Sequence, residues 1–189
     1  IDSISSLSGK TVLLRVDTDV DIKNGKILDD TRLVSAIPTI EFLLKKGADV
    51  NIVGHLGRPE SVSSIQYPVS SIDKKFSLEP VAEWLHQHIK NKIANIKNIK
   101  VGEFDGWAVT ERVNLLENIR FFKEEEENDS KFARELSLLG DVYVNDAFAV
   151  SHRAHASIVG ITKYLPSYAG LHLEKEVEEL SKVLNAAKR

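Results

Sequence analysis

The sequence contains no cysteine and no methionine. The absence of cysteine excludes disulfide bonds, thiolate metal sites and cysteine nucleophiles, so any metal would need histidine or carboxylate ligands. Because the chain begins at Ile1 and has no initiator methionine, we expect it to be a fragment of a longer translated product. At 189 residues it is long enough for one domain with a full core and rather small for two.

Long apolar runs, a large net charge and low-complexity segments are also missing. No stretch approaches the roughly 18 apolar residues of a membrane-spanning helix, and no basic segment followed by an apolar signal core opens the chain. The net charge of −3 predicts no general affinity for nucleic acid or anionic membranes. With only 10 Gly and 5 Pro, a collagen-like or disordered chain is excluded. We expect a globular, cytoplasmic and monomeric protein.

The two commonest nucleotide-binding signatures are absent as well. Gly9, Lys10 and Thr11 resemble the end of a P-loop, but Ile4 stands where the first glycine is required, and the tripeptide precedes a predicted strand instead of following one. No GxGxxG follows any predicted strand. A nucleotide is therefore not expected to bind this chain in either of those ways.

The sequence does contain an alternation of short apolar runs and longer amphipathic segments. Residues 11–16 (TVLLRV) form a β-branched run typical of a strand buried on both faces. Residues 48–53 (ADVNIV) follow a helix predicted over 31–46, which makes a βαβ unit with a parallel pair. Further strands are predicted at 98–101, 112–116 and 141–144, and further helices at 77–89, 129–139 and 171–188. No hairpin turns are recognised between the strands, so the pattern predicts an α/β domain with a mostly parallel sheet.

Polar clusters with basic residues follow the predicted strands where each strand ends. They are 15–19 (RVDTD), 54–59 (GHLGRP), 117–121 (ENIRF) and 145–157 (NDAFAVSHRAHAS). The carboxyl ends of parallel strands share one edge of a sheet, and ligands bind in the crevice there. The side chains expected to surround one cleft are Arg32, which opens the first helix, and His55, Arg58, Arg120 and Arg153.

Arginine forks match phosphate and carboxylate groups, so this set in an acidic protein predicts a pocket for a small, multiply charged anion. For each arginine taken alone, a surface position or a structural ion pair is the alternative. For Arg32 the ion-pair partner would be Asp29 or Asp30.

Two further groups of charged residues are interpreted as structural. His152 and His155 have a spacing that allows a metal site, but no third ligand accompanies them, which favours a supporting or capping role. The acidic run at 123–127 (KEEEE) is interpreted as a solvated loop that leads into the next helix.

Taken together, these motifs resemble the N-terminal domain of phosphoglycerate kinases. RVD, DDTR, GHLGRP, ENIRF, DVYVNDAF and HRAHAS occur in the family's order and spacing, and the resemblance runs from about Leu13 to Leu184. It implies a three-layer αβα, Rossmann-like fold, with residues 1–170 as a substrate-binding domain. Residues 171–189 would be the helix that leads toward a C-terminal nucleotide-binding domain absent from this chain.

The resemblance also implies a role for each site residue. Asp17 and Asp19 would face the hydroxyl end of the substrate. Arg32 would lie toward the carboxyl group that is phosphorylated and, as the catalytic residue, would neutralise charge on the transferring phosphoryl group. The substrate's phosphate would be held by His55, Arg58, Arg120 and Arg153.

Family members transfer a phosphoryl group reversibly between 1,3-bisphosphoglycerate and ADP, giving 3-phosphoglycerate and ATP in glycolysis. The first domain holds the glycerate substrate, and the covalently linked second domain holds Mg-ADP or Mg-ATP. We therefore expect this chain to hold no cofactor and no metal. Alone, it should bind 3-phosphoglycerate without catalysing the reaction.

Two positions depart from the family pattern, because RVDTDVD stands where members commonly have RVDFNVP. Asp19 thus replaces a neutral asparagine, and Asp21 replaces a proline. A carboxylate near an anionic substrate weakens binding unless it is paired or protonated. This keeps open a non-catalytic anion-binding or protein-interaction module derived from the domain, and a structural domain whose basic residues form internal ion pairs.

Overall fold

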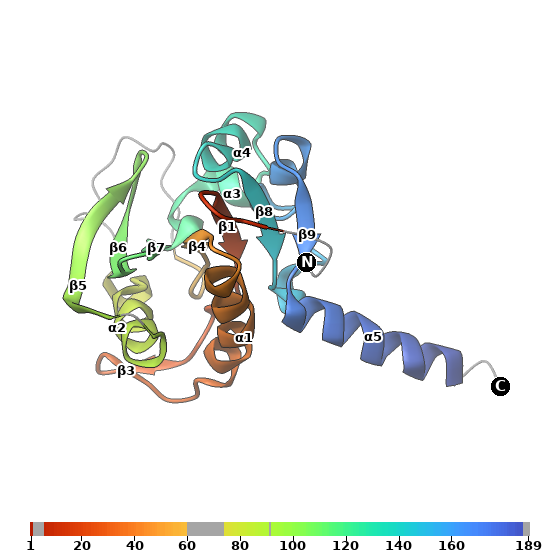
Figure 1. The fold of residues 1–189 in the computed structure, drawn as a ribbon, viewed down its shortest axis with the longest axis horizontal. Helices are drawn as coiled ribbons and strands as arrows, with labels where there is room; N and C mark the ends of the chain where they lie inside the picture. The colour runs from red at the N-terminus through yellow and green to blue at the C-terminus, as the bar shows by residue number, and fades with distance from the viewer. Residues whose placement is uncertain (2–5, 60–73, 91, 187–189) are drawn as a thin grey trace.

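The computed structural model describes residues 1, 6–59, 74–90 and 92–186, which are built around a seven-stranded sheet (Figure 1). In spatial order its strands are β5 (Lys92–Val101), β6 (Phe104–Thr110), β7 (Val113–Leu116), β4 (Asp49–Val53), β1 (Thr11–Arg15), β8 (Val142–Asn145) and β9 (Ser167–Ala169). The strands from β7 to β9 pair in parallel, whereas β6 is antiparallel to both of its neighbours. The predicted α/β class with a mostly parallel sheet is confirmed.

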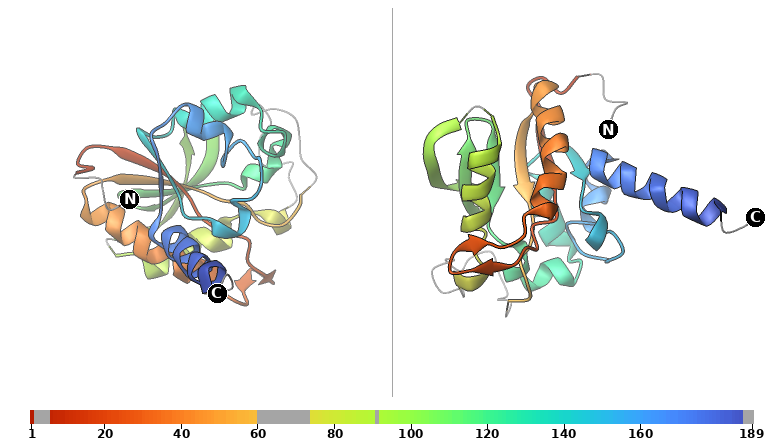
Figure 2. Two further views of the ribbon diagram at one scale, coloured as in Figure 1. Left: turned by 90° about the vertical axis from the view of Figure 1, so that its right-hand side faces the viewer. Right: turned by 90° about the horizontal axis from the view of Figure 1, so that it is seen from below.

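Helices cover both faces of this sheet, which confirms the expected three layers (Figure 2). One face carries α1 (Thr31–Lys45) and α2 (Glu79–His88), and the other carries α3 (Lys123–Glu126) and α4 (Ser130–Ser137). The 3-10 segments are η2 (Lys74–Phe76), η3 (Ile119–Phe121), η4 (Phe148–Val150) and η5 (Gly160–Lys163). A separate small ribbon is made by β2 (Ile22–Lys23) and β3 (Lys26–Ile27), and the chain continues into α5 (Leu171–Ala186).

The alternation of side chains along β1 makes the sheet the middle of two hydrophobic cores. Leu14 points to the core that includes Leu33 and Ile40 of α1, whereas Leu13 points to the core that includes Phe132 of α4. Each of these side chains is at most 2% exposed. Burial on both faces explains the continuous apolar run of this strand and fixes its carboxyl end in place.

The first helix begins where the sequence predicts, but its two aspartates have different partners. Asp29 Oδ1 accepts hydrogen bonds from the Thr31 amide at 2.9 Å and the Thr31 hydroxyl at 2.6 Å. Asp30 Oδ2 instead accepts a hydrogen bond from the Trp84 indole of α2 at 3.0 Å. The start of α1, and with it Arg32 in the first turn, is therefore tied to the neighbouring helix.

The expectation that no hairpin joins the strands is wrong. β5 and β6 form an antiparallel hairpin in which Val101 pairs with Phe104, and Gly102 supplies the positive φ of +59° that the turn requires. The strand predicted at 98–101 is the end of the longer β5, and β6 was not predicted. β2, β3 and β9, with two or three residues each, were not predicted either.

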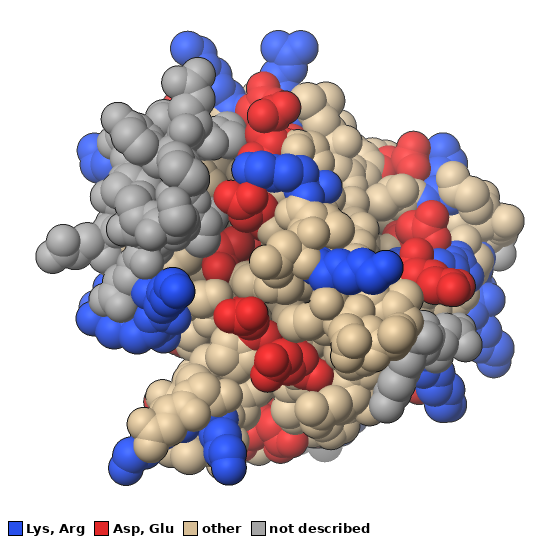
Figure 3. Space-filling model, turned by 90° about the vertical axis from the view of Figure 1, so that its left-hand side faces the viewer, with Lys and Arg blue, Asp and Glu red and all other residues tan. Residues whose placement is uncertain are grey.

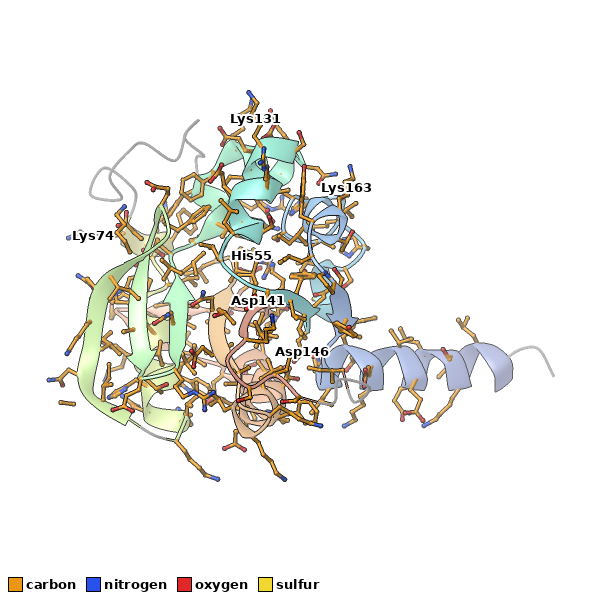
Figure 4. The ribbon with its side chains drawn as sticks, turned by 45° about the horizontal axis from the view of Figure 1, so that its top comes forward. His55, Lys74, Lys131, Asp141, Asp146 and Lys163 are labelled. Atoms are coloured by element: carbon orange, nitrogen blue, oxygen red, sulfur yellow. The ribbon has the colours of Figure 1, made fainter. Side chains whose placement is uncertain are left out.

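The last helix begins at Leu171, close to the predicted start, and extends away from the body of the molecule (Figure 1). Asp146, which lies beside its first turn (Figure 4), accepts hydrogen bonds from the amides of His172 and Leu173 at 2.9 and 3.1 Å. The division of the chain at residue 170 stays a prediction, and the predicted helix end at 188 lies outside the described residues. None of the helices in the described part of the chain is both long and apolar enough to span a membrane.

Candidate functional site

The carboxyl ends of the central strands lie side by side, as the sequence predicts. Arg15, the last residue of β1, is in register with Val53 of β4 on one side and with Asn145 of β8 on the other. Ile52 of β4 is in register with Leu115 of β7. The segments that follow these four strands therefore meet at one edge of the sheet.

Gly57 holds the segment after β4 against the segments around it. Its amide donates to Asp19 Oδ1 at 2.7 Å, and its carbonyl accepts from Arg120 Nη1 at 2.8 Å. Its φ of +59° favours glycine, and a Cβ at this position would lie 2.5 Å from the ring of Phe76. The peptide groups of Gly57 thus link three segments that are far apart in the sequence.

Asn118 has a similar role in the segment after β7. Its side-chain amide donates to the carbonyl oxygens of Leu56 and Phe76 at 2.8 and 3.0 Å, and its Oδ1 accepts from the Arg120 amide at 3.1 Å. The asparagine is wholly buried. It therefore fixes the direction in which Arg120 leaves the backbone.

These segments enclose a cavity of about 300 Å³. The described residues that line it are Asp19, Arg32, His55, Gly57, Arg58, Arg120, Ala149, Val150 and Arg153. Six of the seven predicted site residues are in this group. The seventh, Asp17, does not line the cavity, but it forms an ion pair with Arg32, which does.

The four arginines of the cavity differ in how firmly the protein holds them. Arg120 is 5% exposed, and its Nε lies 3.4 Å from Glu126 Oε1. Arg153 Nε is buried without a hydrogen-bond partner among the described residues. Arg58 is exposed, and the described part of the chain offers it no hydrogen bond or ion pair. Burial lowers the pKa of Arg120. An anion in the cavity would compensate the desolvated charge of Arg120 and would offer hydrogen-bond acceptors to Arg58 and Arg153.

Arg32 forms an ion pair, but with a different residue from those expected. Its Nη1 binds Asp17 Oδ2, and neither Asp29 nor Asp30 is its partner among the described ion pairs. Its side chain is 49% exposed. The pairing with Asp17 holds the guanidinium at the mouth of the cavity.

His55 is neutral at pH 7 and carries its proton on Nε2. Burial, the largest cause, together with the charges of Arg15 and Arg120 lowers its pKa from 6.5 to about 4. Arg15 Nη2 lies 2.9 Å from His55 Nδ1, and since a guanidinium can only donate, Nδ1 must accept. Nε2, which carries the remaining proton, lies 3.6 Å from Asp19 Oδ2.

Asp19 carries a negative charge that its surroundings compensate. The contact with His55 and the Gly57 amide hold the pKa of its carboxyl well below the usual range, against a smaller opposing effect of burial. The acidic residue that departs from the family pattern thus accepts a hydrogen bond from the Gly57 amide and lies close to His55 in the cavity wall.

A buried network behind the cavity was not predicted from the sequence. Arg15, 1% exposed, donates from Nε to the Ser157 hydroxyl at 3.1 Å and from Nη1 to the carbonyl of Val16. The Ser157 hydroxyl and amide are 2.6 and 2.9 Å from the two carboxylate oxygens of Glu125. The interpretation of residues 123–127 as a solvated loop is therefore wrong for the backbone and for Glu125, whereas Lys123, Glu126 and Glu127 are exposed as expected. The segment forms α3, and Glu125 is fully buried because Arg15 and Ser157 compensate its charge.

The predicted supporting role of His155 agrees with its position. Its Nδ1 lies 3.7 Å from Glu125 Oε1, and burial lowers the pKa of the ring. His152 is exposed. Within the described residues there is no group of three or more histidine, aspartate or glutamate side chains placed to hold a metal ion.

The cavity is a local concentration of positive charge. Figure 4 shows Lys74, Lys131 and Lys163 at the periphery, well away from His55. On the face that carries β5, acidic and basic side chains are interspersed over the described atoms (Figure 3). The arginines at the sheet edge are therefore not an extension of a general basic surface on that face.

Comparisons with known proteins give the same family as the motifs. The family model described as "Phosphoglycerate kinase" matches residues 1–189. The chain belongs to the phosphoglycerate kinase family. The phosphoglycerate kinase of Borrelia garinii subsp. bavariensis is 42% identical over 195 residues, covering 100% of this chain and 47% of the relative. That of the Wolbachia of Brugia malayi is 45% identical over 182 residues, covering 95% and 43%.

Solved phosphoglycerate kinase structures share the fold as well. The structure from Coxiella burnetii has a TM-score of 0.77 at 36% identity and covers 96% of this chain and 44% of its own. That from Pyrococcus horikoshii has a TM-score of 0.72 at 33% identity, covering 94% and 44%. The resemblance to the N-terminal domain of phosphoglycerate kinase is confirmed, and the chain spans a little under half the length of the curated relatives it matches.

Proposed function

We propose that this chain is the substrate-binding half of a phosphoglycerate kinase and that its arginine-lined cavity holds 3-phosphoglycerate or 1,3-bisphosphoglycerate. The complete enzyme would transfer a phosphoryl group reversibly between 1,3-bisphosphoglycerate and ADP. The observation that carries the proposal is the convergence of four arginines and a neutral, proton-donating histidine on one cavity of about 300 Å³ at the carboxyl edge of the sheet. That volume suits a small molecule with a charged group at each end.

Within this proposal, the less firmly held arginines take the phosphate. Arg58 and Arg153 have guanidinium donors to spare, and Arg120 and His55 supply donors from the buried wall. Charge-assisted hydrogen bonds of this kind contribute about 1.5–3 kcal/mol each when partly desolvated. Such a cradle favours a dianionic phosphate over a carboxylate.

Arg32 and Asp17 take the other end of the substrate. Arg32, half-exposed at the cavity mouth, would face the carboxyl group and stabilise charge on the transferring phosphoryl group, and Asp17 would orient it. Asp19 lines the cavity at the position proposed to face the substrate's hydroxyl group.

The nucleotide is proposed to bind elsewhere, on the covalently linked C-terminal domain. A magnesium ion does not fit the described residues of this chain, because they hold no cluster of potential ligands and because the cavity is rich in arginine. The chain by itself would then bind the glycerate substrate without turnover. The cytoplasmic location and the monomeric state stay predictions.

The direct test is a calorimetric titration of the chain with 3-phosphoglycerate at low salt, beside an Arg58→Ala variant. Because Arg58 is exposed, its removal should leave the fold intact and weaken binding by about tenfold or more. A matched control is Arg134→Ala, which removes an exposed arginine from α4, away from the cavity lining, and should leave binding unchanged.

The same titration separates the competing functions. Saturable binding that Arg58→Ala weakens supports a substrate site. A folded chain that binds 3-phosphoglycerate no better than sulfate would favour the general anion-binding module. A chain that binds neither anion would favour the structural domain.

A further inference from the structure

Behind the cavity wall, the network of buried polar groups leads from Glu125 to His55. Glu125 is fully buried, and its two carboxylate oxygens contact the Ser157 amide at 2.9 Å and the Ser157 hydroxyl at 2.6 Å. Glu125 does not line the cavity, so it cannot contact a bound anion there. Any effect of Glu125 on the anion site must pass through other residues.

The single proton of the Ser157 hydroxyl gives this network a direction. Arg15 Nε can only donate, so at 3.1 Å it donates to Ser157 Oγ, and the hydroxyl proton is left for Glu125 Oε1. Both Glu125 oxygens then accept hydrogen bonds, which is the pattern of an ionised carboxylate. Burial raises the pKa of Glu125, and the charge of Arg15 opposes this effect. Arg15 and Glu125 are thus each other's buried countercharge.

The other end of Arg15 determines the state of His55. Arg15 Nη2 donates to His55 Nδ1 at 2.9 Å, so the ring proton lies on Nε2. Nε2 is the ring nitrogen near Asp19, and both residues line the cavity. If Arg15 moved away, Nδ1 would lose its donor, and the ring could carry its proton on either nitrogen.

We propose that Glu125 is a positioning residue of the anion site, which holds Arg15 through the Ser157 hydroxyl and thereby keeps His55 as the Nε2-protonated tautomer that donates to the bound anion. The inference rests on the proposed function, because the anion is taken to be the phosphate of 3-phosphoglycerate. It assigns a functional role to a residue that sequence patterning placed in a solvated acidic run.

Electrostatics and positioning predict opposite results when the charge of Glu125 is removed. The negative charge of Glu125 repels an anion bound in the cavity, so the loss of this charge alone would tighten binding. Loss of the positioning role would weaken binding, because His55 would no longer present a fixed donor. The direction of the change therefore distinguishes the two effects.

The first measurement is the affinity for 3-phosphoglycerate of Glu125→Gln and Ser157→Ala, compared with Glu127→Gln. Glu127→Gln removes the same charge from the residue that follows α3. Glu127 pairs with Lys123 at 2.6 Å and is not part of the buried network. We expect Glu125→Gln and Ser157→Ala to weaken binding by about tenfold, the effect of one hydrogen bond, and Glu127→Gln to leave it unchanged or slightly tighter. Ser157→Ala keeps both buried charges, Arg15 and Glu125, so it tests the positioning role even if Glu125→Gln fails to fold.

The second measurement is the tautomer of His55, read from its ring ¹⁵N chemical shifts at pH 7 without ligand. The wild-type chain should show a protonated Nε2 and an unprotonated Nδ1, and both network variants should show a mixture. The proposal is overturned if either folded variant keeps the wild-type tautomer, or if it binds 3-phosphoglycerate as tightly as the wild type. Because this measurement needs no substrate, it still tests whether Glu125 and Ser157 determine the tautomer of His55 if the wild-type chain fails to bind 3-phosphoglycerate and the proposed function is wrong.

Discussion

Among the described residues that line the cavity, Asp19 alone is acidic. Its charge is bound by the Gly57 amide at 2.7 Å and lies 3.6 Å from His55 Nε2. These contacts let the carboxylate persist beside four arginines, but they also occupy donors that an anion would use. We therefore expect the aspartate at this position to weaken the binding of an anion in the cavity.

Replacing Asp19 with Asn should tighten the binding of 3-phosphoglycerate. The amide oxygen can still accept from the Gly57 amide, whereas the negative charge next to the anion is gone, so we expect an increase in affinity of about threefold to thirtyfold at low salt. Asp21→Asn removes a charge from the same segment at an exposed position outside the cavity lining and should have little effect. Calorimetric titration of both variants checks the difference, and equal or weaker binding by Asp19→Asn would contradict it.

His55 should make the stability of the folded chain depend on pH. Its pKa is lowered from 6.5 to about 4, chiefly by burial, so between these values the unfolded chain binds a proton that the folded chain does not. The stabilisation is present above pH 6.5 and is lost as the pH falls through about 4, by up to about 3 kcal/mol.

Urea unfolding of the wild type and of His55→Gln from pH 7.5 to 4.5 measures this contribution. The gap between the two free energies of unfolding should shrink as the pH falls. Other titrating groups are shared by both proteins, so a gap that stays constant over the whole range would mean that His55 is not kept neutral by the fold.

The cavity residues could be predicted because the rule behind them is simple. His55, Arg58 and Arg120 follow directly on strands, and parallel strands bring their carboxyl ends to one edge. Glu125 and Ser157 could not be found in this way. A glutamate in an acidic run looks solvated, and only the fold links it to Arg15 through Ser157. Arg15 stood in a recognised motif, but its sequence position does not indicate which nitrogen of His55 it would bind.

Among the elements, α1 and α5 are both amphipathic in sequence but differ in what covers them. Leu43 of α1 is fully buried, whereas Leu180 and Leu184 of α5 are 48% and 64% exposed. Periodicity predicts an apolar face, but it does not tell whether that face is packed within the same chain. This contrast sets the expected effect of substitutions in each helix.

Removing apolar side chains from the two helices should therefore have unequal costs. Leu43→Ala should lower the free energy of unfolding by about 2–5 kcal/mol, as expected for a cavity in a packed core. Leu180→Ser should change it by less than about 0.5 kcal/mol, because the leucine is already half in solvent. Denaturant unfolding measures both, and a large loss for Leu180→Ser would show that α5 is packed in solution.

The elements that the sequence did not predict are those whose stability comes from their neighbours. β9 has three residues and is a strand because Ser167 to Ala169 pair with β8. β6 contains Gly106, where a Cβ would lie 2.3 Å from the carbonyl of Leu115, so its glycine reflects close approach to β7 instead of a turn. Local sequence propensity indicates neither the pairing of β9 with β8 nor the close approach of β6 to β7. The long helices and the buried central strands, in contrast, show a hydrophobic pattern in the sequence itself.

In the proposed function, the chain as a whole would carry one side of a reaction that needs two charged substrates. Its relatives are a little more than twice as long, and a magnesium ion does not fit the described residues. In that function, the cavity would supply charge neutralisation and orientation for the glycerate, which are two of the requirements of phosphoryl transfer. The position of the nucleotide's terminal phosphate, in line with the attacking carboxylate, would be the requirement met by another domain.

We therefore expect the isolated chain to bind 3-phosphoglycerate and to form no ADP when mixed with it and Mg-ATP. A coupled assay of ADP formation should stay at the background rate at chain concentrations where titration shows the site to be filled, while a full-length relative, such as the Coxiella burnetii protein, turns over under the same conditions. Adding a separately prepared C-terminal domain of a relative should produce a rate that Arg32→Ala abolishes. Turnover by the chain alone would place a nucleotide site within these 189 residues and overturn the division of labour. Binding without turnover, rescued in an Arg32-dependent way, would make the arginine at the cavity mouth the link between the two halves of the reaction.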